Sequence, residues 1–295
     1  MFENDLYLTF SFLAILIFGI PHGAFDASIA ITIKNHGETN FNSPLRRVPH
    51  LILSSPFLYY LSFLIIYMSL AFLTVIAWIF WPFICLIIFL LISGIHFGRG
   101  DSNGISNNLD YLNSVFVHGG LTIIVIPFAH PEDVSLLFNI LSKDSSEFIL
   151  PIINNLMYVW VACLAFHCYL RFKNKKRRIR VLEIAIMLCI ISTVPPVASF
   201  VVYFCLVHSP RHTLKVWNLI SGSQKKKNII ITTTLITIVT WIMSGYGIYF
   251  LNEIDGFFKA TIQIIFIGLA ALTVPHMILI DYLLSRSLPI NQNVR

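Results

Sequence analysis

Seven of the ten histidines fall within or at the edge of apolar stretches, where ionisable side chains are costly and by default suggest function. They are His22, His96, His118, His167, His208, His212 and His276. Any one of them alone is best interpreted as a neutral ring bonded to a neighbouring carbonyl. Imidazoles that several segments bring to a similar depth are what a shared metal site requires, and seven together favour such a site.

His208 and His212 stand four residues apart in the segment HSPRH. Residues at this spacing lie on one face of an α-helix, so both rings can converge on one ion. Pro210, between them, interrupts the backbone hydrogen bond to the Leu206 carbonyl and can kink the helix. The motif therefore indicates a metal site, but only as long as the helical spacing holds.

The segment GIPHGAFDA at 19–27 places Asp26 one helical turn after His22. The carboxylate could accept the ring N–H of a metal-binding His22 and fix its tautomer, or it could be an interfacial cap. Pro21 frees the carbonyl of Ile17, and broken helices at membrane depth usually line a cavity. We interpret this segment as part of the site.

Two further carboxylates follow histidines: Asp101 comes five residues after His96, and Asp281 comes five residues after His276. Each could bond an imidazole or be an ordinary solvated cap. Imidazole ligands suit iron, copper or zinc, so the ligand type does not choose the metal. The chain has no Glu-x-x-His pair, phosphate-binding glycine loop or dinucleotide fingerprint, so any chemistry would be that of the metal.

The composition determines the elements that must hold these side chains. With 57% hydrophobic and 12% charged residues, the chain is too apolar for a water-soluble domain. Backbone polar groups in lipid must be bonded within the segment, so the apolar stretches are expected to be helices. They lie near 6–33, 51–81, 83–98, 111–129, 150–170, 181–207, 229–250 and 260–285. The sequence predicts an all-α polytopic membrane bundle in a single integral membrane domain, 1–295.

Basic residues indicate the topology of this bundle. Eight spans would place the clusters at 171–180 and 225–227 on opposite faces, against the preference of Lys and Arg for the cytoplasm. Pro195-Pro196 can divide the apolar run 181–217 into two spans, giving nine. Sixteen of the 20 Lys and Arg then share one side. We expect eight or nine transmembrane helices, an outside N-terminus and a cytoplasmic C-terminus, with the positive charge anchoring loops and binding no nucleic acid.

Five segments in this order resemble the Brp/Blh family of bacterial and archaeal β-carotene 15,15′-dioxygenases. They are GIPHGAFDA, SGIHFGRGD, VHGG, HSPRH and TVPHMILID. The resemblance covers most of the length, and its P-H-G-A-x-D and H-F-G elements are fairly specific together. It implies a multi-pass enzyme of the cell membrane that splits β-carotene with O₂ at the central 15,15′ double bond into two molecules of all-trans-retinal.

The resemblance also implies a cofactor and its ligands. The cofactor is a non-haem Fe(2+), and the four histidines that would hold it, and act in catalysis through it, are His22, His96, His208 and His212. Asp26, His118 and His276 are expected beside these ligands or along the cavity. A substrate dissolved in the lipid bilayer needs a lateral entrance, and a microbial rhodopsin is a possible recipient of the retinal.

Aromatic side chains could line an apolar tunnel for the polyene, although packing is the better interpretation for any one of them. The candidates are Phe18, Phe25, Phe97, Phe200, Tyr203 and Phe204.

Two other functions remain open. A bis-histidine haem protein for electron transfer also uses histidines on facing helices, and a strong visible absorption band would reveal it. A metal or proton transporter would place polar residues at successive depths through the membrane, whereas these histidines cluster toward one side.

Overall fold

The computed structural model describes residues 5–37, 49–102, 105, 107–142, 146–172 and 178–284. Within these ranges the chain is helical and contains no strand, which confirms the predicted all-α class. Seven of the described helices are long and apolar enough to cross a membrane: Leu8–Asn35, Pro56–Phe80, Pro82–Asp101, Asn108–Ala129, Ser146–Phe172, Lys226–Asp255 and Phe257–Asp281. The chain is a multi-pass membrane protein.

The break expected at Pro195-Pro196 is present. Helix α11 (Arg178–Thr193) ends before it, and helix α12 (Pro196–Val201) begins at Pro196. The helical segments on either side are not among the seven apolar spans. Helix α11 has 16 residues, fewer than the ~20 that a span usually needs, and the segment that starts with α12 runs into Arg211 and Lys215. Whether these two segments complete nine crossings stays a prediction, as does the single domain.

The chain divides into two compact units, each assembled from segments far apart in sequence. Unit 1 comprises Met1–Ile15, Trp81–His208 and Gln292–Arg295, and unit 2 comprises Leu16–Phe80 and Ser209–Asn291.

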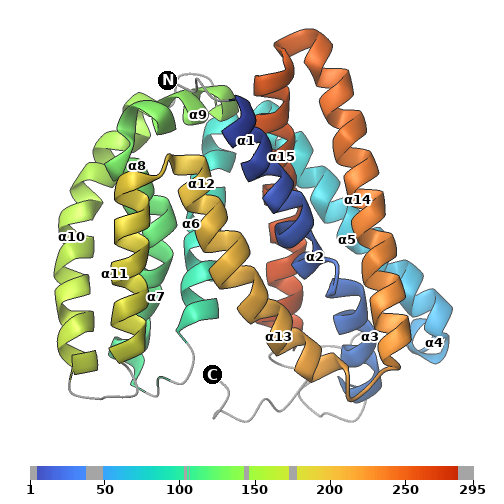
Figure 1. The fold of residues 1–295 in the computed structure, drawn as a ribbon. Coiled ribbons are helices and arrows are strands. Elements are labelled where there is room, and N and C mark those ends of the chain that lie inside the picture. The colour runs from blue at the N-terminus through green and yellow to red at the C-terminus, as the bar shows by residue number, and fades with distance from the viewer. Residues whose placement is uncertain are drawn as a thin grey trace. The chain divides into compact units, whose positions relative to one another are not determined.

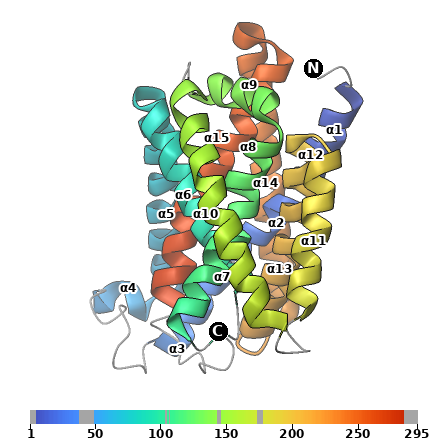
Figure 2. The ribbon, with the colours of Figure 1, turned by 90° about the vertical axis from the view of Figure 1, so that its left-hand side faces the viewer.

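Unit 1 is built on a close crossing of α6 and α7, with α10 packed against α7 and α11 against α10 (Figures 1 and 2). A Cβ at Gly98 would lie 2.1 Å from the Val115 carbonyl oxygen, and one at Gly119 would lie 2.0 Å from that of Gly94, so only glycine permits this approach. Its helices are α1 (Asp5–Ala14), α6 (Pro82–Asp101), α7 (Asn108–Gly120), α8 (Ile126–Ala129), α9 (Pro131–Ser142), α10 (Ser146–Phe172), α11 and α12.

Unit 2 is built on α15, which packs against both α14 and α5 (Figure 1). A buried apolar core that includes Ile29, Ile33, Ile220 and Ile229 joins α3, α13 and α14. Its helices are α2 (Ile20–Gly23), α3 (Asp26–Gly37), α4 (His50–Ser54), α5 (Pro56–Phe80), α13 (Ser209–Ile220), α14 (Lys226–Asp255) and α15 (Phe257–Met277).

Wider π-helical turns occur beside histidines. The described π-helices are η1 (Ile15–Gly19), η3 (Leu121–Val125), η5 (Val202–His208) and η6 (Ile278–Leu284). They lie next to His22, His118, His208 and His276, respectively. A π turn inserts a residue into the helical ladder, and such turns are frequent at functional sites. The π-helical turns of the backbone therefore lie at or within a few residues of the histidine motifs.

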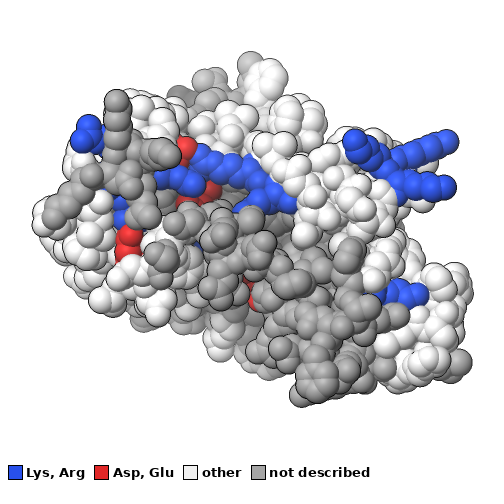
Figure 3. Space-filling model, turned by 90° about the horizontal axis from the view of Figure 1, so that it is seen from below, with Lys and Arg blue, Asp and Glu red and all other residues white. Residues whose placement is uncertain are grey.

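The described basic side chains gather at particular helix ends within each unit. In unit 1, Arg180 at the start of α11 donates to the Asp101 carbonyl at the end of α6 (2.7 Å), and Arg171 lies at the end of α10. In unit 2, Lys34 lies near the end of α3, and Lys226 begins α14. Figure 3 shows blue Lys and Arg atoms in the view from below. Which face of the membrane these ends occupy stays a prediction.

Candidate metal centre

Unit 2 brings three histidines together from three helices: His22 from α2, His212 from α13 and His276 from α15. The ring centroids lie 5.4 Å apart for His22 and His212, 5.5 Å for His22 and His276, and 5.0 Å for His212 and His276. His212 and His276 are buried, and His22 is partly buried. Residues that are 254 positions apart in sequence thus share one cluster.

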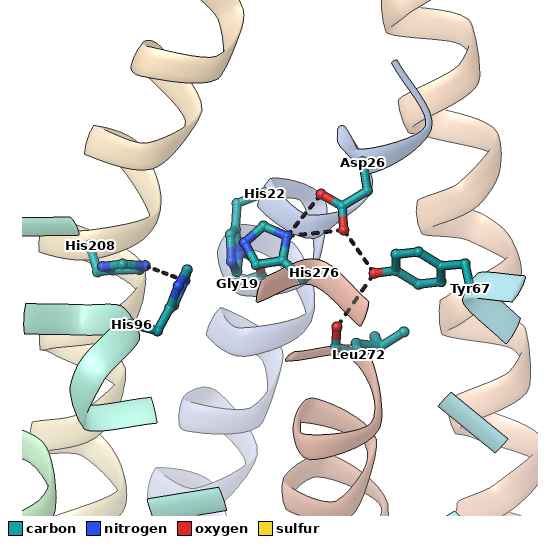
Figure 4. A network of polar contacts seen from close by, with 8 residues as sticks. All are labelled: Gly19, His22, Asp26, Tyr67, His96, His208, Leu272 and His276. Atoms are coloured by element: carbon teal, nitrogen blue, oxygen red, sulfur yellow. Dashed lines mark hydrogen bonds and ion pairs between the residues drawn. The ribbon is translucent and has the colours of Figure 1, made fainter. Parts of the chain in front are cut away.

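The short helix α2 orients His22. It follows the π turn η1, contains Pro21 near its start and ends at the turn formed by Ala24 and Phe25. The Nδ1 atom of His22 bonds the Gly19 carbonyl (Figure 4). A carbonyl only accepts hydrogen bonds, so Nδ1 carries the proton and Nε2 keeps its lone pair. His22 therefore presents Nε2 as a possible metal ligand.

Asp26 serves a different histidine from the one that the sequence suggested. His276 Nδ1 donates to the Asp26 carboxylate, 2.8 Å from Oδ1 and 3.0 Å from Oδ2, and the Tyr67 hydroxyl donates to Oδ2 at 2.8 Å (Figure 4). The helix breaks at Ala24 and Phe25, so His22 and Asp26 belong to different helices and the spacing of a continuous helix does not apply to them. The imidazole that bonds Asp26 is that of His276, not the His22 ring that the sequence analysis proposed.

The spacing of the three rings in unit 2 suits one ion. With a metal–nitrogen bond of about 2.1 Å, a ring centroid lies about 3.2 Å from the metal, and two ligands separated by about 90–120° have centroids about 4.5–5.5 Å apart. The three measured separations, 5.0–5.5 Å, fall within this range. Neutral imidazoles are suitable donors for iron as well as copper and zinc.

Unit 1 contributes a histidine pair, His96 from α6 and His208 from the end of η5. Their Nε2 atoms lie 3.3 Å apart (Figure 4), and both side chains are buried. Two adjacent ligands on a metal with bonds of about 2.1 Å are about 3.0–3.4 Å apart. The pair therefore has the spacing of two donors to one ion.

His208 and His212 belong to different units, and a π turn ends at His208 while α13 carries His212. Their convergence on one ion stays a prediction.

Aromatic side chains pack against the histidine pair of unit 1. The Phe97 ring centroid lies 4.8 Å from that of His208, 5.5 Å from that of Tyr203 and 6.0 Å from that of Phe204. Phe97, Tyr203 and Phe204 are buried, so in the structure these expected tunnel residues form a packed cluster. Phe200 stacks on Phe204 at 5.4 Å. In unit 2, Phe25 packs against Trp217, and Phe18 is exposed.

The remaining residues singled out by the sequence have other partners. His118 on α7 lies against His167 on α10, with centroids 5.4 Å apart, and both are buried. Asp101 accepts a hydrogen bond from the Tyr203 hydroxyl at 2.7 Å. The sequence analysis did not single out Tyr67, and it named Tyr203 only as a possible tunnel residue; neither tyrosine was expected to bond a carboxylate. Their only signal was that a phenol hydroxyl in an apolar helix needs a partner, which holds for most of the 11 tyrosines.

Comparisons with known proteins agree with these motifs. Residues 13–284 match the family model described as beta-carotene 15,15′-dioxygenase. The chain belongs to this family. It is 33% identical over 272 residues to a protein named "Beta-carotene 15,15′-dioxygenase" from Uncultured marine bacterium 66A03, covering 92% of each chain. No solved structure matches this family member. The matched region includes all seven histidines of the apolar segments.

Proposed function

We propose that this β-carotene 15,15′-dioxygenase family member cleaves β-carotene at its central double bond. In the balanced reaction, one β-carotene and one O₂ give two retinals: the carbon–carbon double bond breaks, and each carbon gains one oxygen as a carbonyl. The observation that carries the proposal is the family match across residues 13–284, which includes every histidine motif. The relative with 33% identity bears the same name over nearly its whole length.

The proposed metal is a non-haem Fe(2+) held by His22, His96, His208 and His212. Bound iron with an open coordination position would supply the activation of O₂. Support comes from the 3.3 Å separation of the His96 and His208 Nε2 atoms in unit 1, and from the 5.4 Å separation of the His22 and His212 rings in unit 2. Both values suit neighbouring imidazole ligands.

The chain's own groups would prepare these ligands. The Gly19 carbonyl holds the His22 proton on Nδ1, so Nε2 is available as a donor. Phe97 and Phe204 pack against the His208 ring at 4.8 and 6.4 Å and exclude water from it. The protein would therefore contribute orientation and a dry environment.

The substrate and product suit a protein embedded in lipid. β-Carotene is a hydrocarbon that dissolves in the bilayer, and we propose that it enters laterally between helices. The product aldehyde is also apolar, and a retinal-binding membrane protein such as a microbial rhodopsin is a suitable recipient.

The spacing in unit 1 disfavours the haem alternative. Two histidines on opposite sides of a haem iron would have nitrogens about 4 Å apart, with the porphyrin between them. The His96 and His208 Nε2 atoms are 3.3 Å apart. The pair suits adjacent ligands better than opposed ones.

Expression in cells that make β-carotene tests the function. We expect retinal to accumulate and the orange colour to fade with the wild-type chain, and neither to occur with His208→Ala at equal protein level. Retinal formation by the purified protein from β-carotene and O₂ would establish the direct reaction. No retinal from a folded, iron-loaded protein would contradict the proposal.

A further inference from the structure

His276 lies in the same cluster as His22 and His212, although the family resemblance did not assign it to the iron. We infer that His276 is a further ligand of the iron and that Asp26 and Tyr67 position it. This inference rests on the proposed function, because it requires the iron.

The hydrogen bonds of His276 involve its Nδ1 atom, so its Nε2 atom is the one that could bind a metal. Its Nδ1 lies 2.8 and 3.0 Å from the two Asp26 carboxylate oxygens. A carboxylate oxygen accepts from Nδ1–H, so Nδ1 carries a proton, and in the neutral form of the ring Nε2 has the lone pair that a metal needs. A metal-binding histidine commonly donates its other ring N–H to a carboxylate, which sets the ring's orientation and raises its basicity.

The ring of His276 lies at ligand distance from its neighbours. Its centroid is 5.5 Å from that of His22 and 5.0 Å from that of His212. These separations match imidazoles sharing one ion, as derived above. His276 is also buried, with 4% of its surface exposed, so bulk water does not compete for Nε2. The three rings of unit 2 therefore form a potential three-nitrogen set.

Tyr67 completes the arrangement from a third helix. Its hydroxyl on α5 donates to Asp26 Oδ2 at 2.8 Å and lies 3.4 Å from the Leu272 carbonyl, one turn before His276 on α15. The phenol thus fixes the rotation of the Asp26 carboxylate, which in turn orients His276 (Figure 4). Asp26 and Tyr67 are positioning residues that act through His276.

The test measures Fe(II) affinity of the full-length purified protein by anaerobic competition with a chelator. We expect His276→Ala to weaken binding by about 100-fold or more, and Tyr67→Phe to weaken it by about 10-fold, the lower end of effects seen when a ligand's hydrogen-bond partner is lost. The matched control is Tyr59→Phe. Tyr59 lies on the same helix and donates to the Ala30 carbonyl at 3.0 Å, so Tyr59→Phe loses a bond to the backbone of α3 and not to the Asp26 carboxylate. The Fe(II) affinity of the Tyr59→Phe protein should equal that of the wild type.

Thermal unfolding separates metal ligation from general stability. A metal that binds only the folded state raises the unfolding temperature, and the rise decreases as binding weakens. We expect the metal-free Tyr67→Phe and Tyr59→Phe proteins to unfold at similar temperatures, and Fe(II) to stabilise Tyr67→Phe less. If His276→Ala does not fold, this tyrosine pair decides the inference.

Two outcomes distinguish the inference from the function on which it rests. If His22→Ala loses Fe(II) while His276→Ala and Tyr67→Phe bind it as tightly as the wild type, the role of His276 is overturned and the iron site stands. If the folded wild-type protein binds no Fe(II), the proposed cofactor fails as well.

Discussion

The histidines of unit 2 and those of unit 1 have different neighbours. In unit 2, hydrogen-bond acceptors fix the ring protons: the Gly19 carbonyl bonds His22, and the Asp26 carboxylate bonds His276. In unit 1, His96 and His208 face each other through their Nε2 atoms, and Phe97 packs against the His208 ring. Oxygen acceptors therefore lie at two of the rings in unit 2, and an aromatic side chain packs against a ring of the pair in unit 1.

Each unit also contains a hydrogen bond from a tyrosine hydroxyl to an aspartate carboxylate, and the two bonds are of nearly equal length. Tyr67 donates to Asp26 at 2.8 Å, and Tyr203 donates to Asp101 at 2.7 Å. The Asp26 carboxylate also accepts from the His276 ring, and the Asp101 backbone carbonyl accepts from Arg180. Similar tyrosine–aspartate bonds therefore occur in both units, and in unit 2 the carboxylate also bonds an imidazole.

The largest expected effect comes from removing one histidine of each unit. His22→Ala and His208→Ala should each reduce retinal formation to background and release the iron, because each is a proposed ligand. Retinal assay and metal analysis of the purified proteins measure this, with the exposed His50→Ala as the control. Iron retained in full by His208→Ala would restrict the site to unit 2.

A smaller effect should distinguish the two carboxylates. Asp26→Asn weakens the hydrogen bond to His276, so we expect Fe(II) affinity or turnover to fall by roughly 10–100-fold. Asp101→Asn should change either quantity by less, because Asp101 accepts from Tyr203, which is not a proposed ligand. The two variants are compared by the retinal formed per mole of bound iron. Their Fe(II) affinities are measured separately. Equal losses in both variants would remove the distinction between the units.

The close helix crossing in unit 1 predicts a loss of stability. Gly119→Ala places a methyl group 2.0 Å from the Gly94 carbonyl oxygen, so the backbones must separate, and overpacking of this kind costs about 1–3 kcal/mol or more. Gly268→Ala in α15 of unit 2 is the control, because a Cβ there meets nothing within 4 Å. Denaturant unfolding in detergent measures both. A Gly119→Ala protein as stable as the control would contradict the close crossing.

The smallest effect concerns topology and should leave activity unchanged. Arg178→Cys in unit 1 and Lys226→Cys in unit 2 should react with a membrane-impermeant maleimide only from the cytoplasm, as the basic loops predict. Glu132→Cys and Glu253→Cys should react only from outside. Labelling of intact cells and of inverted vesicles compares the faces. Opposite sidedness of positions 178 and 226 would overturn the nine-span arrangement.

Much of the architecture followed from the sequence, because its causes are local. Lipid forces apolar stretches to satisfy their backbone bonds within each segment, so helices were predictable from hydropathy. Proline cannot continue a helix, so the break before Pro196 was predictable as well. The histidines were conspicuous because charge and polarity are costly at membrane depth. These features depend on residue type and near neighbours alone.

The partners of Asp26 depended on the tertiary structure. Sequence spacing relates only residues on one continuous helix, and the break at Ala24 and Phe25 cancels the relation between His22 and Asp26. The carboxylate instead meets His276, 250 residues away, and Tyr67 from another helix. Only the packing of α3, α5 and α15 decides such contacts, because a buried carboxylate takes whichever donors the folded chain brings within reach.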